Sequence, residues 1–155
     1  MPELKLLVDA VQVSKFISEK RSNELIRKIE GLASKYQATK LQRQVYVANR
    51  LKTSYESVYY NIDDINIAIN NNNKIKFEYY EWTLKGKMEL RQNGIKKDIS
   101  PWALTWDDEN YYLVAFDAEA GMIKHYRVDK MMKMTVLKER REGAQHFKDF
   151  DMALY

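Results

Sequence analysis

The sequence contains no cysteine, which excludes disulfide bonds, thiolate metal ligands and a cysteine nucleophile. It has only two histidines, His125 and His146, and they stand too far apart for an ordinary zinc-binding pattern, so we expect no metal site. A chain without cysteine is typical of a reducing compartment, and we predict a cytoplasmic protein. No apolar run approaches the roughly 20 residues that cross a bilayer, and the N-terminus lacks a signal-peptide core. We therefore expect no membrane partner.

Patterns that carry catalysis are missing as well. The sequence has neither the Gly-x-Ser-x-Gly elbow of hydrolases, nor a glycine-rich phosphate loop, nor the His and carboxylate spacing of metalloproteases. The acidic doublets Asp63-Asp64 and Asp107-Asp108 fit a helix start and a hairpin tip. We expect a protein that is not an enzyme, with no catalytic residue and no cofactor.

The chain has 155 residues, of which 45% are hydrophobic, and this is enough for one ordinary domain or for a small domain with an appendage. Its positive charge is uneven, because residues 1–60 carry 11 basic and 6 acidic side chains whereas residues 61–155 carry 15 and 16. Residues 31–55 contain no acid at all. The cations there can form a solvated linker or meet phosphates, and their modest density favours the linker. They are Lys35, Lys40, Arg43, Arg50 and Lys52.

Apolar residues repeat at helical spacing in two places within the first 36 residues. The first stripe predicts a helix over about 3–16, and the second predicts a helix that begins after Ser18 or Ser22 and ends near Tyr36. We expect an antiparallel pair that must pack on the rest of the chain, a second copy or another domain. The stripes comprise Leu4, Leu7, Val8 and Val11, and then Leu25, Ile29 and Leu32.

The segment 37–60 lacks a clean period and predicts an extended connector with one strand near residues 44–48. A short helix then begins at Asp63 or Asp64, presents Ile65 on its apolar side, and ends at the asparagine run 70–73. This helix would directly precede the part of the chain in which the period changes.

From Lys74 the apolar period becomes two, which is typical of half-buried strands. Turn signals separate the segments, and closing such a set of strands into a small antiparallel barrel would remove the exposed edges. The segment 111–116, apolar on both parities, is expected to be the central strand. The sequence thus predicts an α+β fold. The expected strands are 74–80, 99–106, 111–116, 122–128 and 132–137, and the turn signals are Lys85-Gly86, Asn93-Gly94, Asp107-Asp108 and Ala120-Gly121.

Four blocks in this region resemble the WYL domain of bacterial transcriptional regulators. They match in order and spacing over about residues 62–137, although Tyr111 stands where the name-giving tryptophan is usual. The blocks are Lys74-Ile75-Lys76-Phe77-Glu78-Tyr79-Tyr80, Ser100-Pro101-Trp102-Ala103-Leu104, Tyr111-Tyr112-Leu113-Val114-Ala115 and His125-Tyr126-Arg127-Val128-Asp129-Lys130.

The resemblance implies an Sm-like, SH3-type barrel that senses an effector. In such regulators a winged helix-turn-helix domain precedes the barrel, a helical linker joins the two, and a C-terminal extension called WCX follows. The expected division is therefore a helical linker or dimerisation region over 1–60, a WYL domain over 61–140 and the start of a truncated extension over 141–155. Operator DNA would be contacted only through the absent helix-turn-helix domain.

The resemblance also implies a basic ligand patch that binds an anionic effector, either a nucleotide or a single-stranded nucleic acid. At Lys130 many members carry arginine, and lysine keeps the charge without the planar fork. The matching positions in this chain are Ser100, Tyr112, His125, Arg127 and Lys130.

Strand parity supports part of this patch without the resemblance. If Tyr126 and Val128 face the core, His125 and Arg127 share the other face, about 7 Å apart along one strand. Such a pair beside a hydroxyl suits a phosphate or carboxylate. The alternative is that Arg127 pairs internally, with Asp129 or Glu78. Tyr112 is expected to contribute to the core of the barrel as well.

Three functions fit these patterns. The first is an effector-sensing module of a DNA-binding regulator, and the second is a general single-stranded nucleic-acid-binding module of the Sm-like type. The third is a dimerisation module without a ligand, in which the helical stripes pair with a second copy. We expect a homodimer under the first reading as well as the third.

Overall fold

The computed structural model describes residues 2–33 and 56–148, and the chain divides into two compact units between residues 56 and 57. The sequence-based boundary at residue 60 instead falls inside a helix. The strand expected near residues 44–48 and the basic residues between 35 and 52 lie outside the described residues. Within the part of the chain that is described, no helix combines the length and apolarity needed to cross a membrane.

The first unit contains the two predicted helices, α1 (Pro2–Val13) and α2 (Glu19–Glu30), which contact each other. The Ser18 hydroxyl caps α2 by accepting a hydrogen bond from the backbone N–H of Arg21, at 3.4 Å. Both helices end earlier than the apolar stripes predicted.

The buried face of α2 differs from the predicted stripe. Ile26 and Ser22 are buried, whereas Leu25 is half-buried and Leu32, beyond the end of the helix, is exposed. In α1 the buried residue is Val8, which belongs to the predicted stripe. The predicted buried face of α2 was therefore wrong. The helix is rotated from the prediction because Ser22, a small polar residue, lies on the buried face in place of Leu25.

The second unit begins with α4 (Ser57–Asn70), which starts almost two turns before the predicted Asp63 or Asp64. Its buried face repeats at helical spacing through Val58, Asn61, Ile65 and Ala68. The early turns were missed because an asparagine stands on this face, where the apolar pattern requires a hydrophobic residue.

Asn61 is buried because the chain supplies it with two hydrogen-bond acceptors. Its side-chain amide donates to the backbone carbonyl of Met131 at 2.7 Å and to that of Val128 at 3.4 Å. Val128 is the first residue of η1 (Val128–Lys130), a single 3-10 turn, and Met131 directly follows it. One polar side chain therefore ties α4 to the connection between the last two strands.

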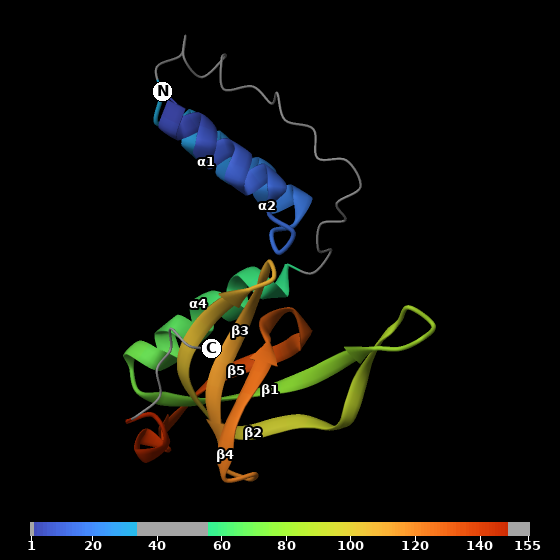
Figure 1. Ribbon diagram of the computed structural model, residues 1–155, viewed down its shortest axis with the longest axis vertical. Helices are drawn as coiled ribbons and strands as arrows, with labels where there is room; N and C mark the ends of the chain where they lie inside the picture. The colour runs from blue at the N-terminus through green and yellow to red at the C-terminus, as the bar shows by residue number, and fades with distance from the viewer. Residues whose placement is uncertain (1, 34–55, 149–155) are drawn as a thin grey trace. The chain divides into compact units, whose positions relative to one another are not determined.

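The five predicted strands are present and form one antiparallel sheet in the order β4-β3-β2-β1-β5 (Figure 1). The hairpin between the first two strands projects beyond the others (Figure 1). The strands are β1 (Asn73–Trp82), β2 (Met88–Asp107), β3 (Asn110–Asp117), β4 (Met122–Arg127) and β5 (Met131–Arg140).

Three expectations about the sheet need correction. The central strand is β2 rather than β3, and the expected turn at residues 93–94 lies inside β2, which runs for 20 residues. The closed barrel is not formed, because β4 and β5 remain the two edges and no ladder joins them within the described residues. η1 carries the chain from one edge strand to the other in three residues, so the strand ends approach without pairing along their length.

The predicted alternation in β1 is confirmed, because Ile75, Phe77 and Tyr79 are buried while Lys76 on the opposite face is exposed. The rings of Phe77, Tyr79 and Tyr126 meet edge to face, with centroids 5.3 to 6.2 Å apart. Such contacts add to the free energy gained from burying the rings alone. The aromatic core therefore joins β1 to β4.

Residues 141–147 fold back along β2. The indole N–H of Trp102 donates to the carbonyl of Glu142 at 2.9 Å, the Arg141 guanidinium lies 3.9 Å from the indole centroid, and Phe147 stacks on the same indole. Gly143 has φ of 88°, and a Cβ there would lie 2.4 Å from the Phe116 ring, so only glycine fits. This segment is thus part of the folded unit.

We predict that Asn61→Leu lowers the free energy of unfolding by about 1–3 kcal/mol, because the carbonyls of Val128 and Met131 lose their buried donor. Urea denaturation followed by tryptophan fluorescence measures this, since all three tryptophans lie in the second unit. Asn66→Leu, at an exposed position of the same helix, is the matched control. Equal midpoints for the two variants would contradict the prediction.

Candidate functional site

The pairing of β3 with β4 sets the geometry of the predicted patch. Tyr112 pairs with Arg127 and Val114 pairs with His125, and paired residues of antiparallel strands point to the same side of a sheet. Tyr126 is buried on the other side. His125 and Arg127 therefore share the outer face, as the parity argument predicts, and His125 is exposed there.

Arg127 forms a two-pronged ion pair with Asp129. Its Nε lies 3.0 Å from Oδ1 and its Nη2 lies 2.8 Å from Oδ2, and Nη2 also donates to the Asn110 amide oxygen at 3.1 Å. The hydrogen bond from Asp129 raises the pKa of Arg127 above its ordinary value. The internal pairing with Asp129 that the sequence left open is present, whereas Glu78 binds Lys133 and Tyr80 instead.

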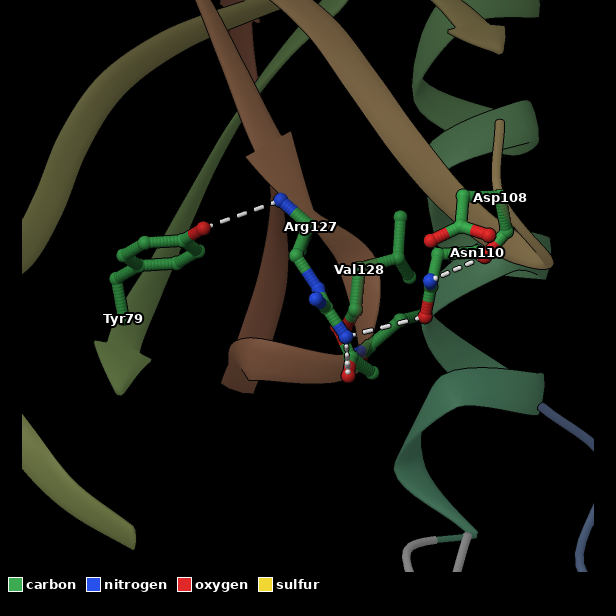
Figure 2. Close-up of polar contacts among 7 residues, drawn as sticks. Tyr79, Asp108, Asn110, Arg127 and Val128 are labelled. Carbon is green, nitrogen blue, oxygen red and sulfur yellow. Dashed lines mark hydrogen bonds and ion pairs between the residues drawn. The ribbon is translucent and has the colours of Figure 1, made fainter. Parts of the chain in front are cut away.

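Two further contacts fix the position of Arg127 (Figure 2). Its backbone N–H donates to the Tyr79 hydroxyl at 3.1 Å, and burial raises the pKa of that phenol. Asn110 is held in turn by a hydrogen bond from its side-chain amide to the Asp108 carbonyl, at 2.7 Å. Asp108 and Glu109 both have positive φ, so the turn between β2 and β3 aims Asn110 at the guanidinium.

The structure brings some of the predicted residues together. Tyr112 and Arg127 are cross-strand neighbours, and His125 lies two residues along β4. Lys130 ends η1 and is half-buried, and its side chain makes no hydrogen bond or ion pair with any described residue. Tyr112 is only half-buried, so its expected contribution to the core was overestimated.

Ser100 lies away from this group. It is buried on β2 and pairs with Phe116, which stands four residues, or roughly 13 Å, along β3 from Tyr112. Its hydroxyl accepts a hydrogen bond from the backbone N–H of Glu142 at 2.9 Å. In this structure Ser100 therefore anchors the segment that follows β5.

Sequence reasoning missed a buried carboxylate on the inner face of the same strands. Asp117, at the end of β3, accepts hydrogen bonds from Lys124 Nζ at 2.7 Å and from the Tyr126 hydroxyl at 2.9 Å. It also caps the following turn through the N–H of Ala120. An aspartate just before the Ala120-Gly121 turn was a signal for the cap, but nothing in the sequence indicated the contact with Tyr126.

Burial opposes ionisation of Asp117, yet the hydrogen bonds from Lys124, Ala120 and Tyr126 outweigh it and hold its pKa below the ordinary value. Burial, together with the carboxylate, raises the pKa of the Tyr126 phenol. Asp117 is therefore ionised at neutral pH and Tyr126 is neutral. The pair fixes β4 against β3 and so positions the outward-facing residues of β4.

We predict that Asp117→Asn destabilises the protein by about 1–3 kcal/mol at neutral pH. The Asp117 side chain is only 3% exposed, and it accepts hydrogen bonds from a charged donor, Lys124, and a neutral donor, Tyr126. Because the pKa of Asp117 is lowered in the folded protein, the ionised carboxylate contributes fully to the free energy of unfolding above the ordinary pKa of about 3.9. This contribution disappears as the pH falls through the folded pKa. Urea midpoints at several pH values measure this. The difference in urea midpoint between the variant and the parent should shrink in acid. A difference that does not depend on pH would contradict a stabilising role for the charge of Asp117.

The control for this variant is Asp107→Asn, at an exposed position of β2. It removes the same charge from a neighbouring strand without breaking a buried hydrogen bond. Its midpoint should follow that of the parent at every pH, so any common effect of net charge is separated from the effect at Asp117.

Residues 60–136 match the family model of the WYL domain. Among solved structures, the chain is similar to the proteasome accessory factor B/C (PafBC) of Arthrobacter aurescens, with a TM-score of 0.48 and 17% sequence identity. That similarity covers 96% of this chain and 22% of the other, so this chain spans about a fifth of the length of that structure. None of the curated proteins matches the sequence.

Proposed function

Because residues 60–136 match the family model of the WYL domain, we propose that this chain is the effector-sensing module of a bacterial DNA-binding transcriptional regulator. It works in the cytoplasm without catalysis, and operator DNA is contacted by a separate helix-turn-helix domain. The effector is an anion, either a nucleotide or a short single-stranded nucleic acid, that binds on the outer face of β3 and β4.

The observation that carries this proposal is the fork between Arg127 and Asp129. Arg127 faces outward beside Tyr112 and its side chain is 34% exposed, so a ligand reaches it from solvent. A phosphate offers the same two-pronged geometry as the carboxylate. Asp129 therefore occupies the place of the ligand, and an effector phosphate replaces it on Arg127, with His125 and Lys130 supplying further donors.

The same exchange gives a route from the ligand to the rest of the regulator. Asp129 is the middle residue of η1, and Asn61 of α4 holds the carbonyls of the first residue of η1 and of the residue that follows it. Releasing Asp129 from Arg127 lets η1 change, and α4 responds through Asn61. Coupling requires only that the effector favour one arrangement of η1 over the other.

We predict that Arg127→Gln weakens binding of a fluorescein-labelled single-stranded DNA hexamer about tenfold or more, because a charge-assisted contact is lost. Asp129→Asn should tighten binding several-fold, because the internal competitor loses its charge. Fluorescence anisotropy at two salt concentrations, with ATP as a competitor, measures both effects. Arg140→Gln, which removes an exposed arginine from β5, is the matched control.

Unchanged affinity in both Arg127→Gln and Asp129→Asn would refute the proposed site. A steep salt dependence without preference for length or competitor would favour the second candidate, a general single-stranded nucleic-acid-binding module. Binding would then not require Arg127.

Dimerisation through residues 1–60 is a further part of the proposal. Leu6 and Leu7 of α1 and Leu32 after α2 are exposed apolar residues in this unit. A second copy would remove them from water, which favours a homodimer. Sedimentation equilibrium of the parent and of Leu6→Asp tests whether these side chains hold two copies together.

A further inference from the structure

The outer face of β1 borders a hollow of about 350 Å³ that is separate from the site around Arg127. Half of its lining residues are lysines from three adjacent strands: Lys76 on β1, Lys96 and Lys97 on β2, and Lys133 on β5. Glu78 is the acid among the lining residues. We call this feature the lysine hollow.

Two β-bulges frame the lysine hollow. Between Ile75 and Phe77 the register of β1 with β2 shifts by one residue, and between Lys76 and Glu78 the register with β5 shifts in the same way. Each flanking strand therefore carries an extra residue beside the same stretch of β1. Bulges interrupt the alternation of a strand and redirect its side chains, and they are common beside binding sites.

Each bulge holds a non-glycine residue in the left-handed region, Asp98 with φ of 51° and Lys133 with φ of 50°. Side chains other than glycine adopt this conformation at a cost in free energy. Such residues occur on both strands that flank β1 at the hollow. The backbone is strained at the positions that set the lysines around the hollow.

The charges of the lysine hollow are not balanced internally. Glu78 accepts hydrogen bonds from Lys133 Nζ at 3.0 Å and from the Tyr80 hydroxyl at 2.9 Å. The side chains of Lys76 and Lys97 make no hydrogen bond or ion pair with any described residue, whereas Lys96 pairs with Phe77 and so stands on the core-facing side of the sheet. Asp98, the nearest acid along β2, is paired with Lys74 instead, at 3.7 Å. Two cations on the outer face, Lys76 and Lys97, therefore border the hollow without a side-chain partner in the part of the chain that the structure describes.

We propose that the lysine hollow binds a small ligand carrying two or more linked phosphate groups. Lysine ammonium groups bind phosphate as mobile point charges, and Lys76, Lys97 and Lys133 on three neighbouring strands suit a polyphosphate better than a single carboxylate. The volume lies at the small end of the range for small-molecule sites. Ile95 offers an apolar wall for the organic part of such a ligand.

This site does not rest on the proposed sensing function. On β2 the hollow is lined by residues 95–97, whereas the strand neighbour of Tyr112 is Thr105. Arg127 and Asp129 are not among the lining residues. A polyphosphate at the lysine hollow and an effector at Arg127 are therefore separate ligands that can be tested with separate variants.

Isothermal titration of the full chain with inorganic triphosphate tests the site. We expect saturable binding with one ligand per chain, and Lys76→Gln combined with Lys97→Gln should weaken it about tenfold or more. The matched control combines Lys85→Gln with Lys87→Gln, which removes the same charge from the hairpin tip and should retain the affinity of the parent. Glu78→Gln should tighten binding several-fold, because it removes the acid from the lining.

Equal weakening in the two double variants would overturn the proposal, because the effect would then come from net charge alone. Absence of saturable binding to the parent, or loss of binding in Arg127→Gln, would overturn it as well. If a single-stranded DNA hexamer binds through the same lysines more tightly than triphosphate, the ligand class is wrong. Circular dichroism establishes that each variant is folded, and Glu78→Gln carries the test if the lysine variant is not.

Discussion

A single ion pair at the end of β4 sets the organisation of the second unit's outer face. The guanidinium of Arg127 donates hydrogen bonds to the carboxylate of Asp129 and to the amide oxygen of Asn110. The backbone N–H of Arg127 donates to the Tyr79 hydroxyl in the core. One residue thus links the core, the turn between β2 and β3, and η1. The pair lies at the surface, so its net contribution to folding is small. In the proposed function, an external anion competes with Asp129 for this guanidinium, on which several contacts converge.

The polar contacts of this unit are concentrated where elements meet rather than within them. Asn61 joins α4 to both ends of η1, and Asp117 joins β3 to β4 through Lys124 and Tyr126. A buried polar side chain with satisfied partners specifies one arrangement, because each alternative leaves a donor or acceptor without a partner. η1 is therefore held from α4 by Asn61 and from β4 by Arg127. Both anchors therefore act on the same three-residue turn.

The strands were predictable because period two in Ile75, Phe77 and Tyr79 is local information, and the same holds for the cap at Ser18. The start of α4 was not, since Asn61 is buried only because carbonyls some 70 residues away accept its hydrogen bonds. Nor did the sequence indicate that the Ser100 hydroxyl is used by the backbone of Glu142, or that Asp98 and Lys133 adopt positive φ. The alternation of side chains along the strand predicted that His125 and Arg127 share one face. It did not indicate whether Arg127 pairs with a carboxylate of this chain or with an external anion.

The return of residues 141–147 along β2 has a practical consequence for spectroscopy. Trp102 has a guanidinium and a phenyl ring against its indole, and its N–H is bound to the Glu142 carbonyl, whereas Trp82 and Trp106 are exposed. Its half-buried indole is therefore contacted by the returning segment both on its ring and at its N–H. The emission of this one indole is a native optical reporter of whether the segment after β5 remains docked.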